Sequence, residues 1–386
     1  MKIKLILLAG IVGGAASMAQ AQTATAEADV SLGKISNQYI CTFDSSVSRA
    51  DVSRETGKAV GPALGQILHT YRNSIRGFAV RMPATPNRSA VAELRANNPK
   101  IAGCEQDQIV KALAPPPGKG PGDGGGSPPP EDVPWGITRV GGPGSQSDNT
   151  AWVIDSGIDL DHPDLNVDVS RSVSYVGDSP EDENGHGTHV AGTIAAIGGN
   201  GIGVVGVSPG TAVVAVRVLN RRGSGSWSGV IAGVDYVAEH GEAGDVANMS
   251  LGGGFSKAVN DAVQAAAANV KFTIAAGNSG DDAKDYSPAS ASGSNIYTVS
   301  ASDINNVMPS WSNYGNPPVD WAEPGVGIKS TYKGGGYTTL SGTSMAAPHL
   351  AGILVQGNVT QCRKTDGSLL FVSSDPDGQA DKVGCR

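Results

Sequence analysis

Four polar residues stand at points in this chain of 386 residues where a packing residue would serve as well. Asp155 lies in VIDSGID, His186 in NGHGTHVAGT, Asn278 in AAGNSG and Ser344 in SGTSMAAPH. Nucleophilic attack on an acyl group needs a hydroxyl, a base of near-neutral pKa, a carboxylate that orients the base, and donors for the oxyanion. The four residues supply all of these groups, and they predict acyl-transfer chemistry.

Aspartate and asparagine residues in these segments also have a simpler structural interpretation. An Asp that follows an apolar strand is often a turn or cap residue, and we interpret Asp159, Asp161 and Asp164 in that way. Asn278 could equally be a turn residue, because Asn and Gly favour turns in any protein.

A metal site is the main chemical alternative. His186 and His189 are three residues apart on a predicted helix and could share a metal ion. The segment has no HExxH pattern, however, and catalytic zinc usually has three protein ligands. We therefore expect His189 to pack within its helix, and His349 to do the same in the helix after Ser344.

The C-terminal two thirds of the chain alternates between short apolar runs and helical patterns. We predict strands at 151–154, 212–219, 246–250, 270–275 and 296–300, and helices at 189–197, 230–240 and 258–269. This rhythm is typical of an α/β fold, a mostly parallel sheet with helices on both faces. Reactive groups gather at the carboxyl ends of such strands, and Asp155 and Asn278 both follow predicted strands.

The segment APPPGKGPGDGGGSPPPEDVP can form neither a buried strand nor a buried helix, and it divides the chain. We predict a linker at 115–131, an N-terminal domain at 22–114 and a main domain at 132–386. In the N-terminal domain we expect strands at 38–43, 77–82 and 101–110 and helices at 47–68 and 89–96, which together form a small α+β unit.

The first 21 residues have the pattern of a secretory signal peptide. Lys2 and Lys4 precede a short apolar run, and small residues follow up to Ala21. The run is too short to span a bilayer, so we expect an exported, extracellular protein. The formal net charge of -8 favours neither nucleic acid nor an anionic membrane as a partner, and we expect a monomer.

Export permits disulfide bonds, and four cysteines allow three pairings. Cys41 and Cys104 fall on predicted strands that could be neighbours, so we pair them, and by default we pair Cys362 with Cys385.

Taken together, the motifs resemble those of the subtilisin-like serine peptidases, or subtilases, of the branch that includes proteinase K. DSGID, HGTHVAGT and GTSMAAPH match the three catalytic blocks in order, and PWGITRV, SLGGG, YSPAS and SNYG match supporting segments. The chain order Asp, His, Ser is that of subtilisin. Residues 22–114 are similar to the family's inhibitor-type propeptide, which implies an α+β, ferredoxin-like fold for this domain.

The resemblance implies a role for each motif residue. Ser344 would be the nucleophile, His186 the general base and then acid, and Asp155 the group that orients His186. Asn278 would donate its side-chain amide to the oxyanion, together with the backbone N–H of Ser344.

The resemblance also implies binding segments. A substrate would insert as an added strand between Gly223-Ser224-Gly225 and Ser250-Leu251-Gly252. Ala275, Ala276 and Gly277 would line the first specificity pocket, and their small uncharged side chains favour apolar or aromatic residues before the cut bond. We expect no organic cofactor, but a structural calcium ion at Asp320 with backbone carbonyls from 291–295.

We therefore expect a secreted serine endopeptidase of broad specificity that is made as a self-processing zymogen. The maturation cut would fall near 112–114 or within the linker, and the tail at 360–386 would be a cap held by its disulfide bond. The alternatives are an inactive peptide-binding protein on the same scaffold and an esterase with the same triad.

Overall fold

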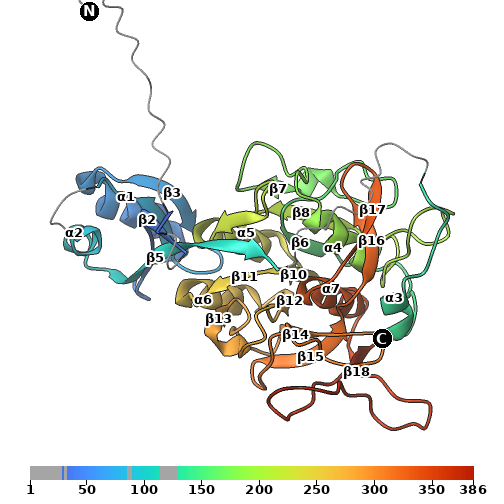
Figure 1. Cartoon of the computed structure of the whole chain (residues 1–386). Coiled ribbons are helices and arrows are strands. Elements are labelled where there is room, and N and C mark those ends of the chain that lie inside the picture. Colours follow the sequence, from blue (N-terminus) through green and yellow to red (C-terminus); the bar gives the residue numbers. More distant parts are fainter. Residues whose placement is uncertain (1–27, 30–32, 85–88, 114–127) are drawn as a thin grey trace, which may run out of the picture.

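The computed structural model describes residues 28–29, 33–84, 89–113 and 128–386, which form two units packed side by side (Figure 1). The predicted signal peptide and residues 115–127 of the predicted linker lie outside the described residues. None of the described helices is long and apolar enough to cross a bilayer.

The N-terminal unit has the order βαββαβ. Its elements are β2 (Lys34–Phe43), α1 (Val52–Val60), β3 (Gln66–Tyr71), β4 (Gly77–Arg81), α2 (Ala90–Asn97) and β5 (Ile101–Ala112). The strands form an antiparallel sheet in the order β5-β2-β4-β3, and the short β1 (Ala28–Asp29) pairs with β2. This is the ferredoxin-like order, with both helices packed against one another.

The prediction of one long helix at 47–68 was wrong. The helix α1 ends at Val60, a 3₁₀ turn follows at Gly61–Ala63, and β3 begins at Gln66. Pro62 has no N–H with which to continue the helix, and Leu64 adopts a left-handed conformation with φ of 55°. These two residues end the helix, although the apolar spacing typical of a helix continues beyond it.

The main unit is built on one seven-stranded sheet in which every pairing is parallel. Its strand order is β15-β14-β12-β10-β6-β8-β7. The bounds are β6 (Ala151–Asp155), β7 (Val173–Ser174), β8 (Val213–Arg217), β10 (Val246–Met249), β12 (Lys271–Ala275), β14 (Ile296–Ser302) and β15 (Val319–Pro324). All five predicted strands of this domain are therefore present.

Helices cover both faces of this sheet. On one face lie α4 (His186–Ala195) and α7 (Thr343–Leu354), and on the other α5 (Trp227–His240) and α6 (Lys257–Ala266). The hydroxyls of Ser226 and Ser256 cap α5 and α6 by accepting backbone N–H groups of the first turn. The short α3 (Trp135–Arg139) follows the linker.

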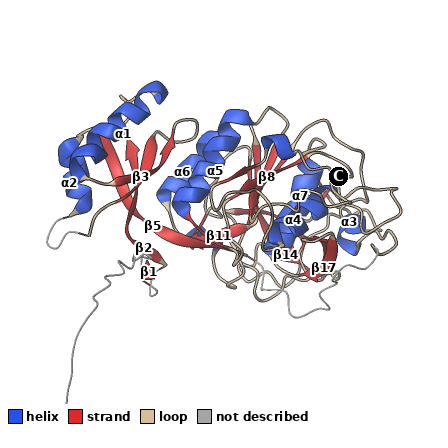
Figure 2. Ribbon diagram, turned by 90° about the horizontal axis from the view of Figure 1, so that it is seen from above, coloured by secondary structure: helices blue, strands red, loops and turns tan. Residues whose placement is uncertain are grey.

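The strand β5 joins the two units. It runs out of the N-terminal sheet and pairs antiparallel with both β9 (Ser224–Ser226) and β11 (Leu251–Gly254) of the main unit. Figure 2 shows this long strand, with α5 and α6 side by side and facing the N-terminal sheet. Buried residues of both units share one apolar cluster, so the contact between them is an extension of the core.

The remaining strands are short. A hairpin joins β16 (Ile328–Tyr332) to β17 (Gly336–Leu340), β13 (Tyr286–Ser287) pairs with β11, and β18 (Thr360–Gln361) pairs with β19 (Gly384–Cys385). Further 3₁₀ turns lie at Arg49–Asp51, Val169–Arg171 and Ala283–Asp285.

Both disulfide bonds predicted from the sequence are present. Cys41 and Cys104 are directly opposite one another on β2 and β5, and Cys362 is joined to Cys385. The second bond closes the tail, which pairs with β15 through Val383 and covers that edge of the sheet.

Candidate active site

The four polar residues singled out from the sequence lie at the carboxyl edge of the parallel sheet. Asp155 is the last residue of β6, and Asn278 follows the end of β12 after a short turn. His186 and Ser344 are the first residue of α4 and the second residue of α7, the two helices that pack on the same face. Parallel pairing therefore brings together residues that are far apart in the chain.

Asp155 and His186 are in direct contact. The Nδ1 atom of His186 lies 2.8 Å and 2.9 Å from the two carboxylate oxygens of Asp155, and both side chains are buried. Because a carboxylate only accepts hydrogen bonds, Nδ1 carries the proton in this pair and Nε2 of a neutral ring is free to act as a base.

Ser344 is fully buried at the start of α7, and its hydroxyl donates to the backbone oxygen of Ser250 at 2.9 Å. Among the described residues, Nε2 of His186 has no hydrogen-bond partner. The structure therefore joins His186 to Asp155 but does not contain the hydrogen bond that would link Ser344 to His186.

The surroundings of His186 act on its pKa in opposite directions. Burial lowers this pKa, but the charge of Asp155, the hydrogen bond that the His186 ring donates to it and the charge of Asp182 outweigh burial and raise it. The raised pKa means that these surroundings stabilise the imidazolium that forms when the ring accepts a proton.

Asn278 is held in one orientation by the start of α7. Its Oδ1 atom accepts the backbone N–H and the hydroxyl of Thr343 at 2.9 Å and 2.8 Å, which leaves the amide nitrogen to face Leu113. That nitrogen donates to the backbone oxygen of Leu113. The preceding Gly277 has φ of 115°, and a Cβ there would lie 2.3 Å from the amide nitrogen of Asn313, so this turn requires glycine.

The chain's own segment at 109–113 occupies the gap between β9 and β11. Residues 109–111 pair with 224–226, and the N–H of Ala112 donates to the oxygen of Gly223 at 2.9 Å. On the other side, Ala112 pairs with Leu251, and the N–H of Leu113 donates to the oxygen of Ser250 at 3.3 Å. The segments that the sequence assigned to substrate binding thus hold this strand between them.

Leu113 lines a pocket of about 440 Å³. The main unit contributes small side chains to the lining, including Gly252, Ala275, Ala276 and Gly277. A methyl group at Gly252 would approach the Leu113 side chain to 3.0 Å, so the absence of a side chain there provides room for it.

Two carboxylates of β5 meet the starts of the two helices that face the N-terminal unit. Asp107, which is fully buried, accepts the N–H of Ser228 in the first turn of α5 at 3.1 Å. Glu105 accepts the hydroxyl of Ser256 and the N–H of Ala258 in the first turn of α6. A helix N-terminus favours negative charge, so both contacts hold the two units together.

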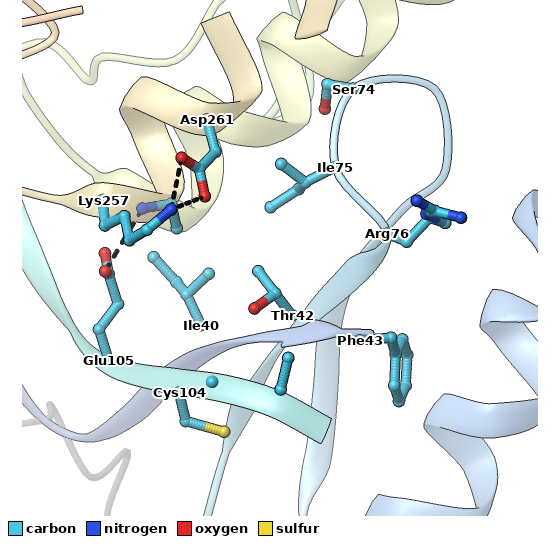
Figure 3. Close-up of a pocket in the computed structure, with 13 residues that line it drawn as sticks. Ile40, Thr42, Phe43, Ser74, Ile75, Arg76, Cys104, Glu105, Lys257 and Asp261 are labelled. Atoms are coloured by element: carbon cyan, nitrogen blue, oxygen red, sulfur yellow. Dashed lines mark hydrogen bonds and ion pairs between the residues drawn. The ribbon is translucent and has the colours of Figure 1, made fainter. Parts of the chain in front are cut away.

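Figure 3 shows Glu105 directed at the start of α6, beside a pocket of about 600 Å³ between the two units. Lys257 on the same helix forms an ion pair with Asp261 rather than with Glu105. The contact of Glu105 is therefore to the helix terminus itself.

In a third contact between the two units, the carboxylate lies on the main unit and the hydrogen-bond donors lie on the N-terminal unit. The carboxylate of Asp235 on α5 accepts the backbone N–H groups of Arg72, Asn73 and Ser74, and also the Ser74 hydroxyl, at 2.7–3.1 Å. These residues form the turn between β3 and β4, and such successive N–H groups bind anions well.

The residues around Asp320 supply only part of a calcium site. The Asp320 carboxylate accepts the N–H of Thr298 at 2.9 Å, and the carbonyl of Asn295 already accepts the N–H of Phe272. In the part of the chain that the structure describes, no group of three or more His, Cys, Asp or Glu residues is placed to hold a metal ion. Calcium at Asp320 stays a prediction.

The other histidines near the site are packed in helices. His189 is fully buried and its Nε2 contacts the oxygen of Ile328 at 3.0 Å, while burial and His186 lower its pKa to about 3. His349 contacts the oxygen of Met345 one turn earlier, and burial lowers its pKa to about 4. Both are placed as the sequence analysis expected.

Two residues with a part in this geometry were not singled out from the sequence. Thr343 orients Asn278, and Asp182 organises the loop before His186. Thr343 precedes Ser344 in GTSMAAPH and Asp182 opens DENGHGTH, so their signal was adjacency to a chosen residue.

Comparison with known proteins shows which family the chain resembles. The model of the Subtilase family matches residues 151–358. Subtilisin-like protease 2 of Pseudogymnoascus destructans is 37% identical over 361 residues, which cover 88% of this chain and 84% of that protein. Proteinase R of Parengyodontium album is 36% identical over 336 residues, which cover 83% of this chain and 78% of that protein.

A solved structure is also similar. The crystal structure of a cold adapted subtilisin-like serine proteinase superposes with a TM-score of 0.51 at 35% identity, and the match covers 64% of this chain and 96% of that one. The predicted α/β fold with its parallel sheet and flanking helices is therefore confirmed.

Proposed function

The chain belongs to the subtilase family and is a serine endopeptidase, and from this premise we propose that it is a secreted, monomeric zymogen that cuts itself between Leu113 and Ala114. The observation that carries the proposal is the position of Leu113. Its N–H donates to Ser250 and its carbonyl oxygen accepts the amide of Asn278, as a substrate residue before the cut bond would do.

In the proposed reaction, the Ser344 hydroxyl leaves Ser250 by a change of rotamer and gives its proton to Nε2 of His186. The oxygen then attacks the carbonyl carbon of Leu113, and the negative charge on the carbonyl oxygen is stabilised by Asn278 and the Ser344 N–H. Asp155 stabilises the imidazolium.

The tetrahedral intermediate collapses by breaking the C–N bond. His186 returns the proton to the departing amine of residue 114, which leaves Leu113 joined to Ser344 as an ester. Water then attacks this ester with His186 again as base, and the released carboxylate of Leu113 and a free Ser344 complete the cycle.

After this cut the N-terminal unit stays in place as an inhibitor. The contacts at Glu105, Asp107 and Asp235 do not depend on the bond after residue 113, so the cleaved unit keeps its hold on α5 and α6. The pocket around Leu113 supports a preference for apolar residues before the bond that is cut in other proteins.

The experiment that tests the proposal compares the parent chain with Ser344→Ala during refolding of the purified full-length protein. We expect the parent to yield a new N-terminus at Ala114, and the variant to fold and remain uncut. Cleavage of the variant at the same bond would contradict self-processing, and a parent cut elsewhere would contradict the assignment of Leu113.

A further inference from the structure

A buried carboxylate that is not one of the proposed catalytic residues lies beside them. Asp182 is 3% exposed and precedes α4 in the loop that leads to His186. Its two oxygens accept five hydrogen bonds, and the distances are between 2.6 Å and 2.9 Å. The donors are the Ser156 hydroxyl, the N–H groups of Asn184, Gly185 and Thr188, and the Thr188 hydroxyl.

Ser156 connects this carboxylate to the strand that carries Asp155. The N–H of Ser156 donates to the Asp155 carboxylate at 2.7 Å, and its hydroxyl donates to Asp182 at 2.9 Å. The same hydroxyl accepts the N–H of Gly187 at 3.0 Å, which is the residue after His186. Hydrogen bonds on both sides of His186 therefore lead back to Asp155.

We infer that Asp182 is a positioning residue, which holds the end of β6 with Asp155 against the start of α4 with His186. The inference rests on the proposed roles of Asp155 and His186. Because a misplacement of about 1 Å can lower a rate about a hundredfold, a fixed junction between these two elements matters to the reaction.

A simple helix cap would explain only part of this arrangement. Asn184, Gly185 and Thr188 lie in the loop and first turn of the same helix, as the donors to a cap do. Ser156 comes from a different element, 26 residues earlier in the chain. Its bond to Asp182 adds nothing to the cap but joins the two elements that carry the imidazole and its carboxylate.

The charge of Asp182 also acts on His186. Together with Asp155 it raises the pKa of His186 against the effect of burial. Three further titratable groups interact with this pair: His189 one turn along α4, Glu181 beside Asp182, and Tyr332, whose hydroxyl donates to the oxygen of Asn184. Of these groups, Asp182 is a carboxylate that also accepts a hydrogen bond from the start of α4, at the N–H of Gly185.

The test uses Asp182→Asn, which removes the charge, and Ser156→Ala, which keeps the charge but breaks the connection to β6. The matched control is Asp245→Asn. Asp245 is also buried and accepts hydrogen bonds from the backbone of Thr150 and the ring of Trp152, but it lies at the opposite end of the sheet, before β10.

All variants are made as full-length chains and, where they do not mature alone, are matured with a trace of the parent enzyme. We measure kcat and KM on a peptide p-nitroanilide between pH 5 and 10, and the thermal unfolding midpoint. Asp182→Asn should lower kcat about tenfold or more, and should move the acidic limb of kcat/KM down by about 0.5 pH unit or more.

Ser156→Ala should lower kcat to a similar degree without moving the acidic limb, and KM should change little in either variant. Asp245→Asn should lose stability while its kcat and pH profile stay those of the parent. The inference would be overturned if Asp182→Asn and Ser156→Ala lost stability but kept the kcat and the acidic limb of the parent.

If Asp182→Asn does not fold, Ser156→Ala alone decides, because a parental kcat in that variant would overturn the role of the connection. Failure of the proposed function is recognised separately. In that case the parent itself is not labelled at Ser344 by a serine-directed sulfonyl fluoride, whatever the variants do.

Discussion

The contact between Leu113 and its pocket leads to a quantitative prediction about self-processing. Replacing Leu113 by Asp removes an apolar side chain from a pocket to which the main unit contributes small, uncharged residues. Leu113 is only partly buried, so the lost transfer free energy is about 2 kcal/mol. The introduced carboxylate has no cationic partner among the main-unit residues that line this pocket, and its partial desolvation costs about 2 kcal/mol more.

A total of about 4 kcal/mol corresponds to cleavage that is about a thousandfold slower. Leu113→Met conserves volume and apolar character, and it should slow cleavage by no more than about tenfold. Leu113→Ala lies between the two, at about thirtyfold.

The assay follows refolding of the denatured full-length chain after dilution, at protein concentrations low enough to make the rate independent of concentration. Samples are separated by gel electrophoresis, and the new N-terminus is identified by mass spectrometry. Cleavage of Leu113→Asp after residue 113 at the rate of the parent would refute the reasoning. So would equal slowing by Leu113→Met and Leu113→Asp, because then the pocket would not distinguish charge from shape.

Two other substitutions test a contact between the two units and a buried carboxyl group beneath the C-terminal tail. Asp107→Ala leaves the buried N–H of Ser228 without its acceptor and removes the shorter of the two hydrogen bonds that the Gln38 amide donates, so the cleaved N-terminal unit should inhibit about thirtyfold less tightly. The lag between cleavage and the first peptidase activity should shorten, and an unchanged lag would contradict the proposed inhibitor contact. Burial raises the pKa of Glu323 well above its usual value and outweighs the opposing effect of the Gly384 backbone N–H. The folded protein therefore retains a proton that the unfolded chain loses above about pH 4.5, and this contribution to stability is lost as the pH rises toward the folded-state pKa. In a Ser344→Ala background, Glu323→Gln should gain unfolding free energy relative to the Ser344→Ala protein by up to about 1.4 kcal/mol per pH unit above pH 4.5, whereas parallel pH curves would contradict this.

The parallel sheet and the position of the site could be predicted because their signals are local. Apolar runs mark the strands, and the residue after each run lies at the carboxyl edge by the geometry of parallel pairing. The position of Asp155 follows directly from this rule. The pairing of Cys41 with Cys104 was predictable for the same reason, since both lie on strands that could be neighbours.

Other features that depend on contacts between distant segments had no local signal and were not predictable. The apolar spacing of α1 continues into β3, and only the backbone at Pro62 and Leu64 separates them. Leu113 meets Asn278 because β5 extends across both units, a distance of 165 residues along the chain. Asp182 has the sequence context of a turn residue, and only its bond to Ser156 distinguishes it.

The central claim is that Ser344 becomes a nucleophile toward peptide bonds through His186 and Asp155. The most direct measurement treats the matured protein with a serine-directed sulfonyl fluoride and follows both the labelled residue and the cleavage of casein. The account predicts one label at Ser344 and loss of casein cleavage in proportion to labelling. An unlabelled protein, a label at another residue, or an intact casein pool beside rapid turnover of a simple ester would contradict it.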